Sequence, residues 1–276
     1  MKEHVFRQVS TTDPAAAYVG GKRNLAKRIV SRIEAIPHEC YAEPFVGMGG
    51  VFLRRNLAPR AEVINDASRD VANFFRILQR HYPQFMDALR FQITSRVAFE
   101  RLCKTDPDTL TDLERAARFL YVQRLAFGGK VAGRSFGVDT SRARFNLNTL
   151  GSRLEDLHER LAGVVIECLD FEEFLRRYDK PTTLFYLDPP YHGSEGYYGK
   201  DMFSREDFTR LAKALAGIKG RFLLSINDHP EIRATFKGFN LEEVETTYTV
   251  RGQGSATAAK ELLVSNGKAK ISRTHA

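Results

Sequence analysis

The sequence is poor in the features that mark several protein classes. Its 276 residues include only three cysteines, Cys40, Cys103 and Cys168, which are widely spaced and form no Cys-x-x-Cys pair. An odd and scattered set of cysteines predicts neither a disulfide framework nor a zinc site, and it suits a reducing cytoplasm. No stretch approaches the ~18 consecutive apolar residues of a membrane span, and residues 1–13 lack the apolar core of a signal peptide. We therefore expect a cytoplasmic protein with a folded core and no metal site.

The chain is basic, with 42 Lys and Arg against 34 Asp and Glu and a formal net charge of +8. The segment 118–144 concentrates this charge, because it holds six basic residues and one acid among several aromatic side chains. An uneven positive charge of this kind suits a polyanionic partner. A charged loop that is exposed to solvent and binds no partner would have the same composition.

Apolar periodicity predicts strands and helices that alternate in two parts of the chain. We expect strands at 40–46, 61–65, 164–169, 182–187, 221–226, 241–247 and 261–265. We expect helices at 24–36, 51–57, 68–80, 171–177, 204–216 and 230–236. Between 84 and 125 helical patterns follow one another, with a capping box at Thr111 and Glu114, and 128–145 is expected to be a loop or hairpin.

This alternation predicts an α/β fold with a doubly wound, mostly parallel sheet. The helical stretch interrupts the alternation, so we expect one domain formed by 1–75 and 161–276, with 76–160 inserted as a smaller lobe. In open sheets of this kind ligands bind outside the carboxyl ends of the strands. The two most unusual turns, after Val46 and after Leu187, both occupy that position.

The first candidate site is the glycine-rich turn Glu43-Pro44-Phe45-Val46-Gly47-Met48-Gly49-Gly50, which follows a predicted strand. Glycines leave room for a ligand to approach the backbone closely. Asp66 ends the next predicted strand, at the usual offset for an acid that binds the two hydroxyls of a ribose. A plain turn followed by a helix-capping aspartate would fit the same residues. No Walker A lysine follows, so a nucleoside triphosphate is disfavoured.

The second candidate site is Asp188-Pro189-Pro190-Tyr191, at the end of another predicted strand. Two prolines cannot continue a strand, and they fix the chain so that a carboxylate, a carbonyl and an aromatic ring face one cleft. Two acceptors and a flat surface suit a planar group that carries an amino substituent. A third segment, Tyr18-Val19-Gly20-Gly21-Lys22, brings an aromatic ring and a cation to a turn before the first predicted helix.

Together these segments resemble the Dam-type (D12 class) DNA adenine methyltransferases, and they occur in the family's order. The segment 18–22 is similar to the family's N-terminal segment, 43–52 to its cofactor loop and Asn65-Asp66 to its ribose-binding pair. Asp188-Pro189-Pro190-Tyr191 is similar to its catalytic tetrapeptide. The segments 223–227 and 261–266 also resemble family segments.

The resemblance implies a Rossmann-like methyltransferase that transfers a methyl group from S-adenosylmethionine to an adenine of double-stranded DNA at specific sites. It implies catalytic roles for the tetrapeptide Asp188, Pro189, Pro190 and Tyr191. It also implies that the cofactor is bound by Tyr18, Lys22, Glu43, Phe45, Gly47, Gly49, Asp66 and Asp188.

The resemblance further implies that the inserted lobe recognises DNA. We expect phosphate or base contacts from Arg124, Lys130, Arg134, Arg142 and Arg144. The family's frequent Phe-Asn-Gly pattern is replaced here by Phe127-Gly128-Gly129, so the target sequence does not follow from the family. A restriction endonuclease partner and a bacterial or phage-infected host cell are both compatible with the sequence.

The residues also indicate a mechanism. Asp188 and the Pro189 carbonyl can accept the two N–H groups of an adenine amine, which directs its lone pair toward the methyl donor. No cysteine lies in a motif, so the covalent thiolate route of cytosine C5 methylation is disfavoured. The target base must be flipped out of the duplex, and Tyr191 is the expected stacking partner. The loop 192–203, with Tyr197 and Tyr198, is expected to close over the base.

Other readings stay open at this point. The chain could methylate N4 of cytosine or an adenine of RNA, or it could be a catalytically inactive DNA-binding module. A nicotinamide-dependent dehydrogenase would share the coarse fold, but it would leave the Asp-Pro-Pro-Tyr tetrapeptide and the basic insertion unexplained.

Overall fold

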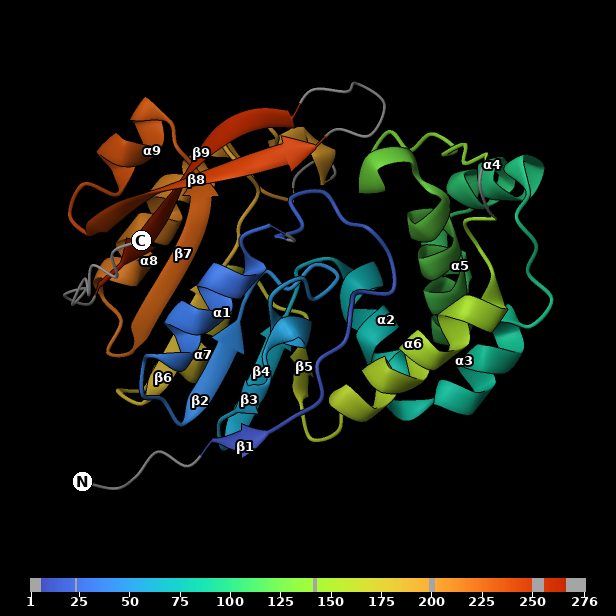
Figure 1. The fold of residues 1–276 in the computed structure, drawn as a ribbon, viewed down its shortest axis with the longest axis horizontal. Helices are drawn as coiled ribbons and strands as arrows, with labels where there is room; N and C mark the ends of the chain where they lie inside the picture. Colours follow the sequence, from blue (N-terminus) through green and yellow to red (C-terminus); the bar gives the residue numbers. More distant parts are fainter. Residues whose placement is uncertain (1–5, 23, 141–142, 199–201, 250–255, 267–276) are drawn as a thin grey trace.

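The fold is built around a seven-stranded sheet (Figure 1). The computed structural model describes residues 6–22, 24–140, 143–198, 202–249 and 256–266. The sheet contains β2 (Cys40–Glu43), β4 (Ala61–Asn65), β5 (Val165–Glu167), β6 (Thr183–Leu187), β7 (Arg221–Asn227), β8 (Asn240–Thr249) and β9 (Ala256–Ser265). Its order is β5-β4-β2-β6-β7-β9-β8. The first five strands in this order pair in parallel, whereas β9 pairs antiparallel with both β7 and β8, so the predicted fold class is confirmed.

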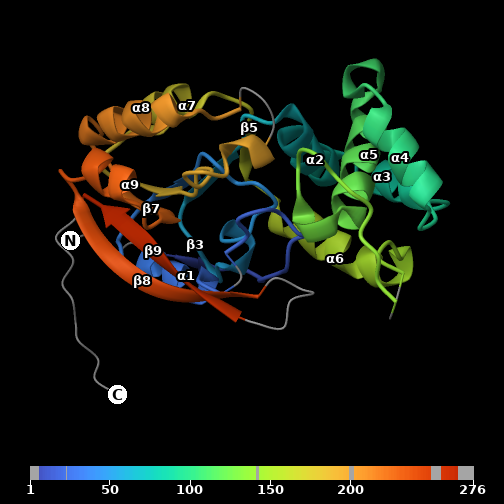
Figure 2. The ribbon, with the colours of Figure 1, turned by 90° about the horizontal axis from the view of Figure 1, so that it is seen from above.

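Helices cover both faces of this sheet. They are α1 (Ala26–Glu34), α2 (Arg69–Arg80), α7 (Phe171–Tyr178), α8 (Arg205–Ala216) and α9 (Pro230–Thr235). Side chains alternate along each strand, as the period of two requires. Tyr186 of β6 joins the cluster under α1 and α2, whereas its neighbours Phe185 and Leu187 join the cluster under α7, α8 and α9. Figure 2 shows α7 and α8 on one side of the sheet and α1 on the other.

The remaining helices form a lobe beside the sheet. They are α3 (Tyr82–Leu89), α4 (Arg96–Lys104), α5 (Asp112–Leu125) and α6 (Leu147–Arg160). In both views this lobe lies beyond the edge strand β5 (Figures 1 and 2). The predicted capping box is confirmed, because Thr111 and Glu114 exchange side-chain and backbone hydrogen bonds at the start of α5. The buried side chains of the lobe belong to the same cluster as those of α1 and α2.

The helix predicted at 51–57 is wrong. Only one 3₁₀ turn, η1 (Phe52–Arg54), forms there, and the short strand β3 (Leu57–Ala58) follows and pairs with β1 (Arg7–Gln8). Arg55 leaves the helical region because its fully buried guanidinium turns inward to bind Glu62 of β4 at 2.7 Å. A buried charge must be paired, and this pairing overrides the local helical pattern.

Among the described residues, no helix has the length and apolar character needed to cross a membrane.

Candidate active site

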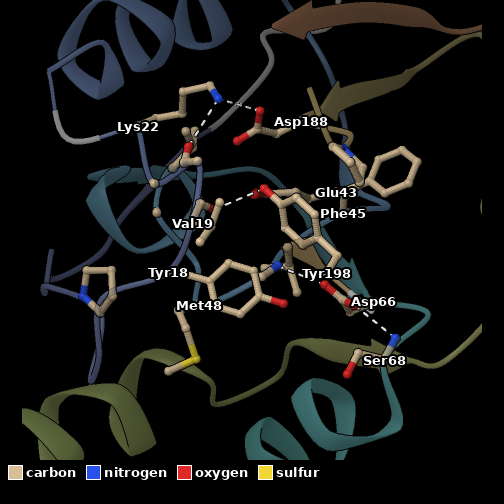
Figure 3. Close-up of a pocket in the computed structure, with 18 of the residues that line it drawn as sticks. Tyr18, Val19, Lys22, Glu43, Phe45, Met48, Asp66, Ser68, Asp188 and Tyr198 are labelled. Atoms are coloured by element: carbon tan, nitrogen blue, oxygen red, sulfur yellow. Dashed lines mark hydrogen bonds and ion pairs between the residues drawn. The ribbon is translucent and has the colours of Figure 1, made fainter. Parts of the chain in front are cut away.

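A cleft of about 480 Å³ lies at the carboxyl ends of the parallel strands. Its walls come from the turns after β2, β4, β5 and β6 and from the N-terminal segment 13–22. The sheet order changes direction between β2 and β6, and such a switch point is the usual position of a ligand in this class of fold. Figure 3 shows Lys22 and Asp188 at one end of the cleft and Asp66 and Ser68 at the other.

At the first end, Asp188 is held by an ion pair with a buried lysine. Lys22 Nζ lies 2.6 Å from Asp188 Oδ1, and the lysine side chain is only 1% exposed. Ser225 Oγ of β7 donates to the same oxygen at 3.2 Å. Burial raises the pKa of the Asp188 carboxyl, and the ammonium and hydroxyl partners oppose that rise. The carboxylate is therefore fixed in place with one oxygen, Oδ1, already engaged.

The lysine also reaches the aromatic ring of the tetrapeptide. Lys22 Nζ lies 4.3 Å from the centre of the Tyr191 ring, within the range of a cation–π contact. Tyr191 in turn hydrogen bonds to Glu261 of β9, an acid that is fully buried. One cation thus joins two members of the tetrapeptide.

Between the two ends lies a second buried acid, Glu43, at the end of β2. The Tyr41 hydroxyl donates to Glu43 Oε2 at 2.6 Å. Burial raises the pKa of Glu43 to about 8, with a further contribution from the nearby Asp188 charge. Glu43 is consequently protonated in most molecules at pH 7.

At the far end, Asp66 follows β4 and faces the glycine-rich turn. Its carboxylate accepts the backbone N–H of Gly47 at 2.9 Å and that of Ser68 at 2.9 Å. Burial raises the pKa of Asp66 to about 6, although both backbone hydrogen bonds lower it. Gly47 has φ of 51°, and a Cβ atom there would lie 3.0 Å from the ring of Tyr18. The turn can therefore approach Tyr18 and Asp66 only because this residue is glycine.

Three segments from distant parts of the chain meet over the cleft. The Val19 N–H donates to Gly129 O at 3.1 Å, and the Tyr198 hydroxyl donates to Val19 O at 3.0 Å. The Ala132 N–H donates to Tyr197 O at 3.0 Å. The N-terminal segment 18–22, the basic loop of the lobe (residues 128–140) and the loop 192–198 after the tetrapeptide are therefore linked to one another by hydrogen bonds.

Two residues that follow β5 belong to the site, although they were not among the predicted site residues. Asp170 and Phe171 line the cleft, and the Phe171 ring lies 5.7 Å from that of Phe45. Arg210 of α8 holds both residues, with Nη2 at 2.6 Å from Asp170 Oδ2 and its guanidinium 4.4 Å from the Phe171 ring. Their position directly after a predicted parallel strand was the signal that could have identified them.

Most residues predicted to bind the cofactor lie on the walls of this one cleft. These are Tyr18, Lys22, Glu43, Phe45, Gly47, Asp66 and Asp188. Gly49 does not line the cleft. It adopts a φ of 80° in the turn and packs against Leu53. Of the tetrapeptide, Asp188 and Pro190 line the cleft, whereas Pro189 and Tyr191 lie beside it.

The cations predicted to contact DNA differ in their contacts within the protein. Arg124 donates to Ala15 O at 2.6 Å and Arg144 to Ala126 O at 3.2 Å, so both hold backbone of the protein itself. Arg134 approaches Gln123 Oε1 at 3.4 Å, and burial lowers the pKa of its guanidinium. Lys130 lies 5.7 Å from the Tyr197 ring. Arg142 lies outside the described residues.

Two histidines next to the tetrapeptide form a group with one acid. His192, His229 and Glu231 bring potential ligand atoms within 4.8 Å of one another. The two rings stack at 4.0 Å, His192 Nε2 contacts Glu231 at 3.1 Å, and His229 caps α9 by accepting the Glu231 N–H. His229 therefore acts as a helix cap, and His192 packs against its ring and contacts the Glu231 side chain.

Comparison with known proteins assigns the family. A family model described as D12 class N6 adenine-specific DNA methyltransferase matches residues 18–250. The chain is 28% identical over 274 residues to the type II methyltransferase M1.LlaDCHI of Lactococcus lactis subsp. cremoris, covering 92% of this chain and 95% of the relative. It is 24% identical over 284 residues to a DNA adenine methylase of Haemophilus influenzae, covering 93% and 94%.

A third relative is viral. The type II methyltransferase M.CviBI of Paramecium bursaria Chlorella virus NC1A is 22% identical over 240 residues, covering 85% of this chain and 90% of the relative. Because the family model spans the glycine-rich turn, the helical lobe and the tetrapeptide, the chain belongs to the D12 class of adenine-specific DNA methyltransferases.

Proposed function

We propose that this enzyme transfers the methyl group of S-adenosylmethionine to N6 of an adenine that has been flipped out of double-stranded DNA. The observation that carries the proposal is one cleft with an anchored carboxylate, Asp188, at one end and a second carboxylate, Asp66, at the other.

The lining of the cleft fits this cofactor. Asp66 is an acceptor for the two hydroxyls of a ribose, and the rings of Phe45 and Phe171 fit a flat adenine. The acids Glu43 and Asp188 suit a positively charged sulfonium. A volume of about 480 Å³ is in the range of small-molecule sites. A nucleoside triphosphate would instead meet a wall with several acids.

When bound, S-adenosylmethionine supplies an electrophilic methyl group. The protein contributes acceptors for the target amine, whose lone pair is otherwise delocalised into the purine ring. Within the described part of the chain both contacts of Asp188 go to Oδ1, which leaves Oδ2 to accept an N–H of the amine. A fixed carboxylate in a partly dry site also stabilises the positive charge that develops on nitrogen during attack.

Tyr191 is the proposed stacking partner of the flipped base. Lys22 lies 4.3 Å from the centre of its ring and helps to hold the ring in place. Stacking of a base on an aromatic ring contributes about 1–3 kcal/mol, which offsets part of the few kcal/mol that unstacking the base from the duplex costs.

We assign DNA recognition to residues 76–160, with Lys130, Arg134, Arg142 and Arg144 as the principal cations. Relatives named type II methyltransferase, DNA adenine methylase and phage DNA N-6-adenine-methyltransferase leave restriction–modification, chromosome regulation and phage self-protection as the candidate roles. We place the activity in the cytoplasm of a bacterial or phage-infected cell, where such DNA is present.

The test is replacement of Asp188 by asparagine, which preserves its shape. Treated DNA would be digested to nucleosides and analysed by mass spectrometry. We expect the wild type to produce N6-methyldeoxyadenosine and Asp188→Asn to be slower by about 10²–10³-fold, the usual loss when one charge-stabilising group is removed.

Glu39→Gln is the matched control, because Glu39 is exposed just before β2, at the amino ends of the parallel strands, and the change removes the same charge outside both the cleft and the lobe. The proposal would be wrong if Asp188→Asn methylated DNA at the wild-type rate, or if the product were N4-methyldeoxycytidine.

A further inference from the structure

The loop that carries the tetrapeptide needs anchors that its own backbone cannot supply. Pro189 and Pro190 have no N–H groups, so the chain leaves β6 without donors that could hold it to a neighbouring strand. Yet Asp188 and Tyr191 must keep fixed orientations relative to each other if one binds the amine and the other the ring of the same base. Side chains of the neighbouring strands provide the missing anchors.

The first anchor is Asn227, the last residue of β7. Its Oδ1 accepts the His192 N–H at 2.9 Å, and its Nδ2 donates to His192 O at 3.1 Å. A side-chain amide thus takes the place of a strand partner for the residue that follows Tyr191. Ser225, two residues earlier on the same face of β7, holds Asp188.

The second anchor is Glu261 of β9, which stands directly opposite Asn227 in the antiparallel ladder. Glu261 is fully buried, and it hydrogen bonds to the hydroxyl of Tyr191. Its carboxylate also interacts electrostatically with the ammonium of Lys22, which lies over the Tyr191 ring. Burying a carboxylate in the interior of a strand is costly, so an apolar residue would serve better if the position only packed the hairpin.

We propose that Glu261 is a positioning residue for methyl transfer, which fixes the ring of Tyr191 through the tyrosine hydroxyl so that the flipped base is held against Asp188. The inference rests on the proposed function of this cleft. Asn227 fixes the backbone just beyond the ring, so Tyr191 is held both at its hydroxyl and at the following peptide. Without the hydroxyl contact, Tyr191 retains its place in the loop but loses its single orientation.

The experiment compares Tyr191→Phe, Glu261→Ala and Glu261→Gln with the wild type. Tyr191→Phe removes only the hydroxyl, and glutamine preserves an acceptor for it. We expect Tyr191→Phe and Glu261→Ala to lower kcat by about 10- to 100-fold, the scale of small misplacements in an active site. We expect Glu261→Gln to recover most of this loss, and Tyr191→Phe combined with Glu261→Ala to be no slower than either change alone.

Two further measurements separate positioning from general loss of structure. Cofactor affinity, measured by calorimetry, should stay within about twofold of the wild type. A duplex with 2-aminopurine in place of the adenine that the wild type methylates should show less fluorescence quenching by stacking in Tyr191→Phe. If Glu261→Ala does not fold, Tyr191→Phe still tests the inference.

Glu245→Gln, an exposed position on the adjacent strand β8, is the matched control and should leave kcat unchanged. Equal kcat in Tyr191→Phe and the wild type, or a Glu261→Gln enzyme as slow as Glu261→Ala, would overturn the inference. Failure of the wild type to methylate DNA would instead refute the proposed function.

Discussion

Two acids of the cleft differ in protonation because their surroundings differ. Glu43 has a pKa of about 8, since the effect of burial outweighs the hydrogen bond from the Tyr41 hydroxyl. Asp66 has a pKa of about 6, because two backbone N–H groups compensate part of its burial. At pH 7 the free enzyme therefore carries a mostly neutral Glu43 and a mostly ionised Asp66.

This difference predicts a proton linkage. A sulfonium charge in the cleft favours the ionised form of Glu43 and lowers its pKa from about 8. Binding of S-adenosylmethionine at pH 7 should then release a proton, and its affinity should rise between pH 6 and pH 8. S-adenosylhomocysteine has a neutral sulfur and should release less. Calorimetry in buffers of different ionisation enthalpy measures the released protons.

Glu43→Gln is the control for this linkage, because glutamine cannot titrate. The variant should release the same number of protons when it binds S-adenosylmethionine as when it binds S-adenosylhomocysteine. Equal proton release by the two ligands in the wild-type enzyme would contradict the assignment of the linkage to Glu43.

At the scale of elements, the turn between β2 and η1 depends on backbone conformation. Gly47 combines a φ of 51° with close approach to the Tyr18 ring. Its N–H is also one of the two donors to Asp66. A side chain at this position would therefore disturb the backbone, the aromatic wall and the carboxylate together.

We expect Gly47→Ala to lower the free energy of unfolding by about 1–2 kcal/mol and to weaken cofactor binding at least about tenfold, because Tyr18 must move. Gly163→Ala is the matched control, since Gly163 has a φ of 78° with no atom near its added Cβ. It should show the loss of stability without the loss of affinity. Thermal unfolding and calorimetry check the pair, and equal affinity in the two variants would contradict the expectation.

At the scale of the whole molecule, direct side-chain contacts hold the lobe against the sheet. Gln123 Nε2 of α5 donates to Ala17 O at 2.9 Å, just before Tyr18 in the cleft wall. Arg160 at the end of α6 binds Glu62 of β4 at 2.8 Å. If the lobe binds DNA as we propose, the DNA would contact a part of the protein that is joined directly to the cleft.

The basic loop of the lobe predicts strong salt dependence of DNA binding. If six phosphates are neutralised, the logarithm of the affinity should fall with the logarithm of salt concentration at a slope near ~−5, from ~−0.9 per contact. Lys130→Gln should reduce the magnitude of the slope by about 0.9. Lys219→Gln is the control, because it removes an exposed charge just before β7, at the amino ends of the strands. It should leave the slope of the salt dependence unchanged. Fluorescence anisotropy across a salt series measures both, and an unaltered slope in Lys130→Gln would argue against its phosphate contact.

The sequence by itself determined the alternation of strands and helices and the chemistry of the turns that end β2, β4 and β6. These features depend on residues that are close in the sequence. The spacing of apolar side chains determines whether a segment forms a helix or a strand, and glycine or proline determines the turn that follows it. Asp66 and Asp188 could be named in this way because each ends a strand, and parallel strands bring such ends to one edge of the sheet.

Only the tertiary structure decided which side chains meet across large sequence separations. Glu261 pairs with Tyr191, Arg124 holds the carbonyl of Ala15, and Arg144 holds the carbonyl of Ala126. The helix predicted at 51–57 was wrong because Arg55 has a buried partner, Glu62, on another strand. Buried polar groups must find partners, and the packing of the whole chain, not the local pattern, determines where those partners lie.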